Sequence, residues 1–269
     1  MQGKIKEFGL VLSKIRNPWK IVLDKLGIIR QPYILRFYNG LKVEIRPDSG
    51  DLYGCFEVLL RGDYTKLGQS LKGEDVVIDV GANIGSFSLL AGKAVGAEGK
   101  VIALEPDERN FRQLQRNIAL NNLTNVKPIR CCLGSYSGDI ELYGSDVSLF
   151  NSIYSSVDNK EVSRVESQKV PITTLKDLMR DLEIDQCQYL KIDCEGAEYD
   201  ILEAMSKKSA AKVEQVTIEV HKVPGHSEQE INDSMENLGY RLSAEAGIRY
   251  FKRSPIAEGA ETEDKLVTH

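Results

Sequence analysis

The sequence predicts an α/β domain in which a mostly parallel sheet is covered by helices on both faces. From residue 75 onward, apolar runs of strand length alternate with amphipathic stretches of helical period. The last two apolar runs follow each other with no helix between them, so we expect them to pair antiparallel. The 269 residues, of which 42% are hydrophobic, suffice for one large domain with a buried core.

Residues 1–30 are basic and predict two helices. Asn17-Pro18 is expected to begin the second helix, with Asn17 as the N-cap and Pro18 as the first helical residue. The predicted apolar faces contain Ile5, Phe8, Leu12 and Ile15 in the first helix, and Trp19, Val22 and Leu26 in the second. We interpret the pair as a layer that packs on the main domain. A helix lying on a membrane surface is the alternative.

A β-hairpin is expected next, between residues 33 and 46. Its strands alternate apolar and polar residues around Asn39-Gly40, and both of these turn residues tolerate positive φ. A helical stretch at 53–60 precedes Gly62-Asp63-Tyr64. We predict that residues 1–70 form an N-terminal extension of helices and a hairpin that covers the cofactor site.

The main domain is predicted to span residues 71–253. Its strands are expected at 75–80, 100–104, 126–133, 189–193, 216–220, 240–244 and 248–252, and its helices at 84–95, 108–121, 174–182, 197–205 and 228–238. Residues 139–171 interrupt this rhythm as an insertion of short strands and polar loop. Residues 254–269 are polar and without pattern, so we predict a disordered tail.

Composition narrows the class of protein. The net charge of −5 argues against a nucleic-acid partner. The five cysteines show no C-x-x-C spacing, which favours reduced, buried thiols and a cytoplasmic location. No apolar run is long enough for a transmembrane helix, and the N-terminus lacks the apolar region of a signal peptide.

The first strand of the main domain ends in a glycine turn, residues 79–85. Ligands of open α/β sheets bind at the carboxyl ends of the strands, where this turn lies. Its spacing is G-x-x-x-G, which differs from the G-x-G-x-x-G of dinucleotide sites. S-adenosylmethionine carries a sulfonium cation and no phosphate, so Asp79 suits it. We expect Gly81 and Gly85 to let a ligand approach the backbone.

The second strand ends in Glu105-Pro106, twenty positions beyond Gly85. A carboxylate at this place is suited to accept hydrogen bonds from both ribose hydroxyls. The third strand ends near Leu133, which we expect to border the adenine. S-adenosylmethionine is therefore the predicted cofactor, and the predicted contacts are Asp79, Gly81, Ala82, Asn83, Gly85, Glu105, Pro106, Leu133 and Asp193.

The fourth and fifth strands end in groups suited to acid–base chemistry. Asp193 and Glu195 follow one strand, and Glu219 and His221 follow the other. We predict catalytic roles for Asp193, Glu219 and His221, because deprotonating an alcohol for methyl transfer needs a base. If the strand continues past Asp193, we expect only one of the two carboxylates to face the substrate, and for Glu195 both a cap of the next helix and a catalytic role remain open. Asp193, Glu219 and His221 could also hold a divalent metal, although the spacing does not demand one and we predict none.

Together these motifs resemble the FkbM-type methyltransferases. The resemblance runs from about Glu57 to Lys252 and rests on Gly62-Asp63-Tyr64, residues 77–85, Leu104-Glu105-Pro106, residues 171–175, residues 191–198 and Glu219-Val220-His221. It implies a Rossmann-like class I methyltransferase fold, with a seven-stranded sheet that contains one antiparallel strand. It also implies methyl transfer from S-adenosylmethionine to a hydroxyl of a sugar, lipid-linked glycan or secondary metabolite. Cys194 replaces the aliphatic residue common in the family, as a packing substitution.

Other functions remain open at this point. In an RNA cytosine methyltransferase Cys194 would be the nucleophile, but no Pro-Cys pair is present there. A non-catalytic cofactor-binding module would bind S-adenosylmethionine without turnover, and a nicotinamide-dependent dehydrogenase is disfavoured by the glycine spacing. The acceptor is expected to contact residues 51–64 and 144–169. The oligomeric state is not predicted.

Overall fold

The computed structural model describes residues 9–66, 69–143, 156–157, 160–161, 167–245 and 247–254. Its centre is a seven-stranded sheet of order β13-β14-β12-β11-β3-β4-β5. The strands are β3 (Val76–Val80), β4 (Lys100–Leu104), β5 (Val126–Ile129), β11 (Cys187–Ile192), β12 (Val213–Glu219), β13 (Tyr240–Glu245) and β14 (Ile248–Arg253). β14 pairs antiparallel with both β12 and β13, whereas the β5-β4-β3-β11-β12 pairs are parallel. The predicted fold class, including its single antiparallel strand, is confirmed.

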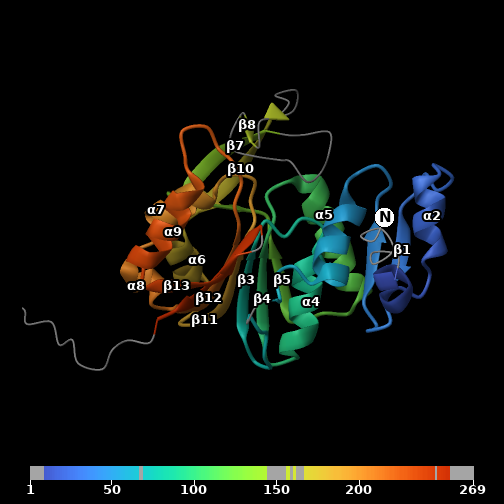
Figure 1. Cartoon of the computed structure of the whole chain (residues 1–269), viewed down its shortest axis with the longest axis horizontal. Coiled ribbons are helices and arrows are strands. Elements are labelled where there is room, and N and C mark those ends of the chain that lie inside the picture. The colour runs from blue at the N-terminus through green and yellow to red at the C-terminus, as the bar shows by residue number, and fades with distance from the viewer. Residues whose placement is uncertain are drawn as a thin grey trace, which may run out of the picture.

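Helices cover both faces of this sheet (Figure 1). The helices on one side are α4 (Ser86–Val95) and α5 (Glu108–Leu120), and those on the other are α6 (Leu175–Asp181), α7 (Glu198–Ala204), α8 (Lys207–Ala210) and α9 (Glu228–Asn237). Because successive strand residues point to opposite faces, the sheet has two apolar cores. Val77 and Val101 belong to the α4 side, and Ile78 and Ile102 to the other.

The third predicted strand is shorter than expected. β5 ends at Ile129, and the chain then leaves the main sheet. Cys132–Leu133 form β6, which pairs with β10 (Ser167–Thr173) in a separate three-stranded sheet, and β10 also pairs with β7 (Gly138–Tyr143). The insertion therefore has a sheet of its own. β8 (Ser156–Val157) and β9 (Lys160–Glu161) form a further small pair within it.

The N-terminal extension is attached to α5. Strands β1 (Tyr33–Arg36) and β2 (Lys42–Ile45) form the predicted hairpin, in which Gly40 adopts a φ of 91° and Asn39 does not adopt positive φ. The side-chain oxygens of Asn121 and Asn117 accept hydrogen bonds from the backbone N–H groups of Lys42 and Glu44, at 2.8 and 2.7 Å. These bonds satisfy the otherwise unpaired edge of β2.

Helix α2 (Trp19–Lys25) differs from its prediction in two respects. The side chain of Asn17 does not cap it, because it donates to the carbonyl of Ile34 and accepts from the N–H of Arg36. The predicted apolar face is also exposed rather than packed. Ile21 is the buried residue of α2, whereas Trp19, Val22 and Leu26 are 58%, 54% and 66% exposed. Of the preceding predicted face, Ile15 is buried and Leu12 exposed, while Ile5 and Phe8 lie outside the described residues.

The predicted helix at 53–60 is a short α-helix continued by a π-helix, α3 (Asp51–Cys55) and η1 (Phe56–Arg61). After it, the backbone carbonyls of Asp63 and Tyr64 accept hydrogen bonds from the hydroxyls of Tyr250 and Tyr189. These bonds hold Tyr64 over the carboxyl ends of the central strands. Among the described residues, no helix has the length and apolar content needed to cross a bilayer. Residues 255–269 of the predicted tail lie outside the described residues.

Candidate active site

Two cavities meet at the carboxyl ends of the central strands. The first extends along the ends of β3, β4 and β6, and is lined by Glu105, Pro106, Cys131, Cys132 and Leu133, among others. The second lies under α3 and η1, and is lined by Tyr53, Glu57, Tyr64, Glu219 and His221, among others. Both are bordered by Gly81, Asn83, Asp193 and Glu195. Groups at this junction can therefore contact a molecule in either cavity.

The two glycines of the predicted turn are required for packing. A Cβ atom on Gly81 would lie 1.7 Å from the carbonyl oxygen of Asp193, and one on Gly85 would lie 2.6 Å from Leu114. Both glycines also have positive φ. Gly85 is not among the residues that line either cavity, and its role in binding a ligand stays a prediction. Ala82 and Asn83 do reach cavity walls.

Asp79 lies behind the turn and is fully buried. Its carboxylate accepts from the hydroxyl of Ser88 at 2.5 Å and lies 3.1 Å from the ammonium of Lys191. Lys191 in turn lies 3.2 Å from Asp193 and donates to the carbonyl of Gly81 at 2.7 Å. Burial alone would lower the pKa of Lys191, but Asp193 and Asp79 outweigh burial and raise it. Asp79 therefore acts on the site through a permanently charged Lys191.

Glu105 lies where the sequence predicts it, in the wall of the first cavity. Its two oxygens accept from the N–H groups of Asn83 and Asp107, at 2.8 and 2.9 Å. Burial raises the pKa of Glu105 to about 7, although both hydrogen bonds oppose this. Each oxygen keeps a second lone pair for a ligand hydroxyl. Pro106 and Leu133 line the same cavity, as predicted for the adenine end.

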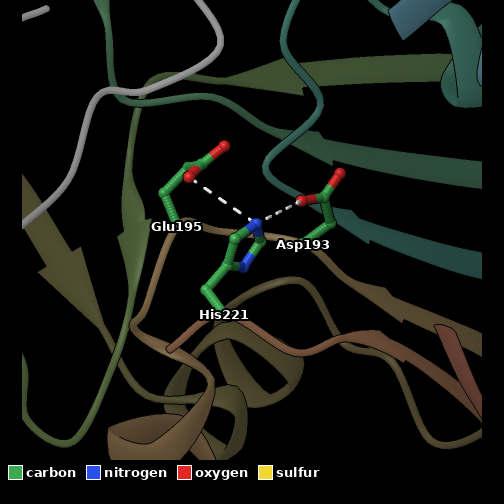
Figure 2. Close-up of side chains that lie close together, drawn as sticks. All are labelled: Asp193, Glu195 and His221. Carbon is green, nitrogen blue, oxygen red and sulfur yellow. Dashed lines mark ion pairs between the residues drawn. The ribbon is translucent and has the colours of Figure 1, made fainter. Parts of the chain in front are cut away.

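Asp193 and Glu195 both face the site. β11 ends at Ile192, and Glu195 adopts a φ of 54°, so the alternation of an extended strand no longer holds beyond Ile192. The N-cap residue of α7 is Ala197, so Glu195 does not occupy the N-cap position. The expectation that only one of the two carboxylates faces the site is therefore wrong. The Nε2 atom of His221 lies 4.0 Å from Asp193 and 3.6 Å from Glu195, and Figure 2 shows the ring between the two carboxylates.

His221 is held by a carboxylate that the sequence analysis missed. Its Nδ1 atom lies 2.9 Å from Oε1 of Glu198, a fully buried residue of α7. This contact places the proton of the neutral ring on Nδ1 and leaves Nε2 toward the cavity. A histidine with one nitrogen fixed by a carboxylate and the other directed at a substrate is the arrangement of a general base.

The acidic groups of the cluster titrate at different pH values. Burial raises the pKa of Glu195 to about 8 and that of Glu219 to about 7, with Asp193 adding to both effects. Burial would also raise the pKa of Asp193, but Lys191 and His221 outweigh it and keep that pKa below its usual range. Burial would lower the pKa of His221, but Glu198, Glu195 and Asp193 raise it well above its usual value. At neutral pH, Asp193 is therefore ionised and His221 charged.

Tyr64 connects two of these carboxyl groups. Its hydroxyl lies 2.9 Å from Oδ2 of Asp193 and also contacts Oε2 of Glu219. A phenol has one proton, so it donates to only one carboxylate at a time. The second contact is satisfied when Glu219 carries a proton, which agrees with the raised pKa of Glu219. Asp193, Tyr64 and Glu219 thus form a chain along which a proton can be shared.

A divalent cation would find ligands at the same place. One ligand atom each of Asp193, Glu195 and His221 lies within 4.8 Å of the other two. A cation bound between two of these atoms, with bonds of about 2.1 Å to each, would span most of this distance. The three groups differ from the predicted trio, because Glu195 takes the place of Glu219. Lys191 already neutralises Asp193 and competes with a cation for that carboxylate.

Cys194 is a poor nucleophile at this site. Burial, followed by the charges of Glu198 and Asp193, raises its pKa well above 9. A thiol must ionise to attack a pyrimidine ring, and this environment opposes ionisation. The structure therefore disfavours the RNA cytosine methyltransferase alternative. All five cysteines are free.

Three functional side chains escaped the sequence analysis as site residues, namely Tyr64, Lys191 and Glu198. Lys191 had a detectable signal, because it is a charged residue inside an otherwise apolar strand. Glu198 lies on a helix whose sequence gives no sign that it is fully buried. Tyr64 is 155 residues from its partner Glu219, and no local pattern connects them.

Comparison with known proteins agrees with this geometry. A family model described as the methyltransferase FkbM domain matches residues 79–242, which is more than half of the chain. The matched segment contains all the residues that line the first cavity. It also contains the cluster of Asp193, Glu195, Glu198, Glu219 and His221.

Several curated methyltransferases are similar in sequence. Methyltransferase sdnD of Sordaria araneosa is 27% identical over 65% of this chain and 76% of the relative. The hexuronic acid methyltransferase AglP of Haloferax volcanii is 28% identical, over 78% of this chain and 83% of the relative. The 31-O-demethyl-FK506 methyltransferase FkbM of Streptomyces tacrolimicus is 26% identical, over 71% of this chain and 82% of the relative.

Proposed function

The chain belongs to the FkbM family of S-adenosylmethionine-dependent methyltransferases, and we propose that it methylates a hydroxyl group of a small molecule or glycan. The proposal rests above all on the junction of the two cavities, where Asp193 and Glu195 border both. A methyl donor in one cavity and a hydroxyl in the other would meet beside these carboxylates. The names of AglP and FkbM, which specify a hexuronic acid and an O-demethyl compound, support an oxygen acceptor.

The cofactor is assigned to the first cavity. Glu105 would accept hydrogen bonds from the ribose hydroxyls, and the adenine would lie toward Pro106 and Leu133. The amino acid part would then lie along Asn83, with the sulfonium toward Asp193. The ionised state of Asp193 supports this placement, because a carboxylate attracts the sulfonium cation.

The second cavity is assigned to the acceptor. Its walls carry Glu57, Glu195 and Glu219 in addition to Asp193. The ionised carboxylate of Asp193 disfavours a polyanionic substrate such as RNA, because its phosphates would be repelled. The cavity suits a hydroxyl compound, because the carboxyl groups offer acceptors to its hydroxyls. We retain the predicted absence of a nucleic-acid partner and the cytoplasmic location as part of this proposal.

The reaction needs a group that accepts one proton. The methyl donor would supply an electrophilic carbon: the acceptor oxygen would bond to it as the C–S bond breaks, and the electron pair of that bond would remain on a neutral thioether. The hydroxyl proton then passes to a base. His221 is charged at neutral pH, but a sulfonium cation bound nearby lowers its pKa by like-charge repulsion. Nε2 of His221, with Nδ1 held by Glu198, then accepts the proton, and Asp193 orients the hydroxyl.

The proposal is tested with the substitution His221→Asn. His221 borders only the acceptor cavity, so the loss of a general base should lower kcat by about 10²- to 10⁴-fold. The Kd of S-adenosylmethionine, measured by calorimetry, should stay nearly unchanged. His226→Asn is the matched control, because His226 lies outside both cavities and pairs with Glu230.

The assay follows the labelled methyl group from S-adenosylmethionine onto a panel of hexuronic acids and other hydroxyl compounds. Mass spectrometry of the product should place the methyl group on oxygen. A methyl group on nitrogen or ring carbon would contradict the proposal, as would an unchanged kcat in His221→Asn. The assay is repeated after chelation of metals. Retained activity supports the metal-free reaction, whereas activity restored only by Mg²⁺ or Mn²⁺ would assign His221 to a cation.

A further inference from the structure

The outer face of α2, defined as Trp19, Val22 and Leu26, is an apolar surface without a partner among the described residues. Each of the three side chains is more than half exposed. They recur at positions i, i+3 and i+7, so they project from the same side of the helix. Two more exposed apolar side chains, Leu12 and Ile28, lie shortly before and after α2. Single exposed apolar residues are ordinary, but a cluster on one helix marks an interaction surface.

Basic side chains lie on both flanks of this face. At about 100° per residue, Lys20 and Lys25 project to opposite sides of the stripe formed by Trp19 and Leu26. Between residues 9 and 36 the chain carries six Lys or Arg side chains and one acidic side chain, Asp24. Asp24 accepts a hydrogen bond from Tyr33 at 2.7 Å. This segment is strongly positive in a chain whose net charge is −5.

Four of the positive charges lack an ionic partner within the described part of the chain. None of Arg16, Lys20, Lys25 and Arg30 forms an ion pair with a residue that the structure describes. Arg16 lies over the exposed ring of Tyr38, with its guanidinium carbon 5.5 Å from the ring centroid. Most of the chain's negative charge thus lies elsewhere, which leaves this surface free for an anionic partner.

We propose that the outer face of α2 docks the enzyme onto an anionic lipid surface. A short helix with an apolar stripe, a tryptophan and flanking lysines lies in the headgroup region of such a surface, with its apolar side chains among the acyl chains. The lysines then contact lipid phosphates while their aliphatic stems lie along the apolar region. Each Lys or Arg near an anionic leaflet adds to the attraction.

Charge decides against a second copy of this chain as the partner. A two-fold contact would bring the same surface of each subunit together, and would therefore gather Lys20 and Lys25 of both subunits around one apolar patch. Like charges at such an interface are repelled. Nucleic acid is a poor fit as well, because the centre of the surface is made by the aliphatic side chains of Val22 and Leu26.

The position of the surface relative to the acceptor cavity agrees with docking. Lys25 lines an apolar groove together with Leu10, Phe56 and Tyr53. Gly50 and Tyr53 line both this groove and the acceptor cavity. Figure 1 shows α2 at the outer edge of the molecule, beside β1 and away from α8. In an enzyme docked through α2, this groove would connect the docked region with the wall of the acceptor cavity.

The single tryptophan of the chain makes the test direct. Trp19 is the only tryptophan, so its emission reports on this surface alone. The full chain is mixed with vesicles of phosphatidylcholine, with or without about one-third phosphatidylglycerol. We expect a blue shift of emission and co-sedimentation with the anionic vesicles, both reduced as salt increases. Emission that stays unshifted with anionic vesicles would overturn the proposal, as would equal binding to neutral vesicles.

Two variants locate the contact. Val22→Ser with Leu26→Ser should weaken co-sedimentation about tenfold or more, because two apolar side chains no longer insert. Lys20→Glu with Lys25→Glu should weaken it to a similar degree. The matched controls are Leu242→Ser, an exposed leucine of β13, and Lys207→Glu with Lys208→Glu on α8. Equal losses in controls and variants would overturn the proposal, and so would a concentration-dependent dimer, without vesicles, that Val22→Ser with Leu26→Ser dissociates.

Discussion

Glu105 is a buried carboxyl group whose protonation changes near neutral pH. Its pKa of about 7 means that it is partly protonated near neutral pH. In the proposed placement of the cofactor, two ribose hydroxyls would donate to Glu105 and favour its ionised form, so its pKa would fall when the cofactor binds. Binding then releases a proton below about pH 7. We therefore predict that the affinity for S-adenosylmethionine falls as the pH decreases from about 8 to 6, by up to about tenfold per unit.

Calorimetry in buffers of different ionisation enthalpy measures both the affinity and the released proton. Glu105→Gln cannot ionise, so it should bind the cofactor weakly and with a flat pH dependence over this range. Glu108→Gln is the control, because Glu108 is a neighbouring but solvent-exposed carboxylate paired with Arg112. An affinity of the unmodified enzyme that does not change with pH would show that Glu105 does not hold the ribose.

A substitution of Glu198 can identify the base, because the two candidate bases predict opposite shifts of the pH profile of kcat. Its carboxylate raises the pKa of His221, and charged His221 lowers the pKa of Glu219. Glu198→Gln removes a negative charge while keeping the shape of the side chain. If neutral His221 is the base, its pKa falls and the acidic limb of the kcat profile moves to lower pH. If Glu219 is the base, the loss of charge on His221 raises the pKa of Glu219 and the limb moves to higher pH.

We expect the shift to lower pH, measured from initial rates with saturating cofactor and acceptor. Glu203→Gln, on the same helix but with its side chain exposed, is the control and should leave the profile unchanged. A shift to higher pH would exclude His221 as the base and assign the role to Glu219.

The residues that the sequence reveals are those whose position follows from topology alone. Asp193, Glu219 and His221 follow two strands that pair in parallel, so their convergence could be predicted before any coordinate was known. Glu198 and Tyr64 depend on how a helix and a loop pack over the strand ends. Their partners are separated from them by 23 and 155 residues, and no local periodicity encodes such contacts.

The elements show the same division between local pattern and packing. The alternation of apolar runs and amphipathic stretches predicted the central strands and helices, because each element must bury one face. It failed for α2, where an apolar stripe is spaced as a core face but remains exposed. Periodicity predicts which residues share a side of a helix, but it does not predict what covers that side. The departure of β6 from the main sheet likewise depends on pairing with β10, forty residues later.

At the scale of the whole molecule, the cofactor and acceptor parts of the site draw on different regions of the chain. The first cavity is built by the ends of β3, β4, β6 and β11, whereas α3 and η1 roof the second. The division of the chain at residue 70 stays a prediction. Of these two cavities, the N-terminal elements line only the second. The insertion between β7 and β10 is joined to this body through its own small sheet.

This organisation predicts the result of removing residues 146–165, most of which lie outside the described residues. The β7–β10 pairing ends with Tyr143 opposite Ser167, so Gly144, Ser145 and Glu166 would remain as a three-residue hairpin loop. The shortened enzyme should therefore fold, and should bind S-adenosylmethionine with nearly unchanged affinity in calorimetry. Acceptor methylation should be lost, because long insertions beside a site commonly hold the substrate. Replacing the same residues by a Gly-Ser linker of equal length separates lost side chains from an altered connection. If the deletion removes cofactor binding as well, in a protein that still unfolds cooperatively, the two parts of the site are not independent.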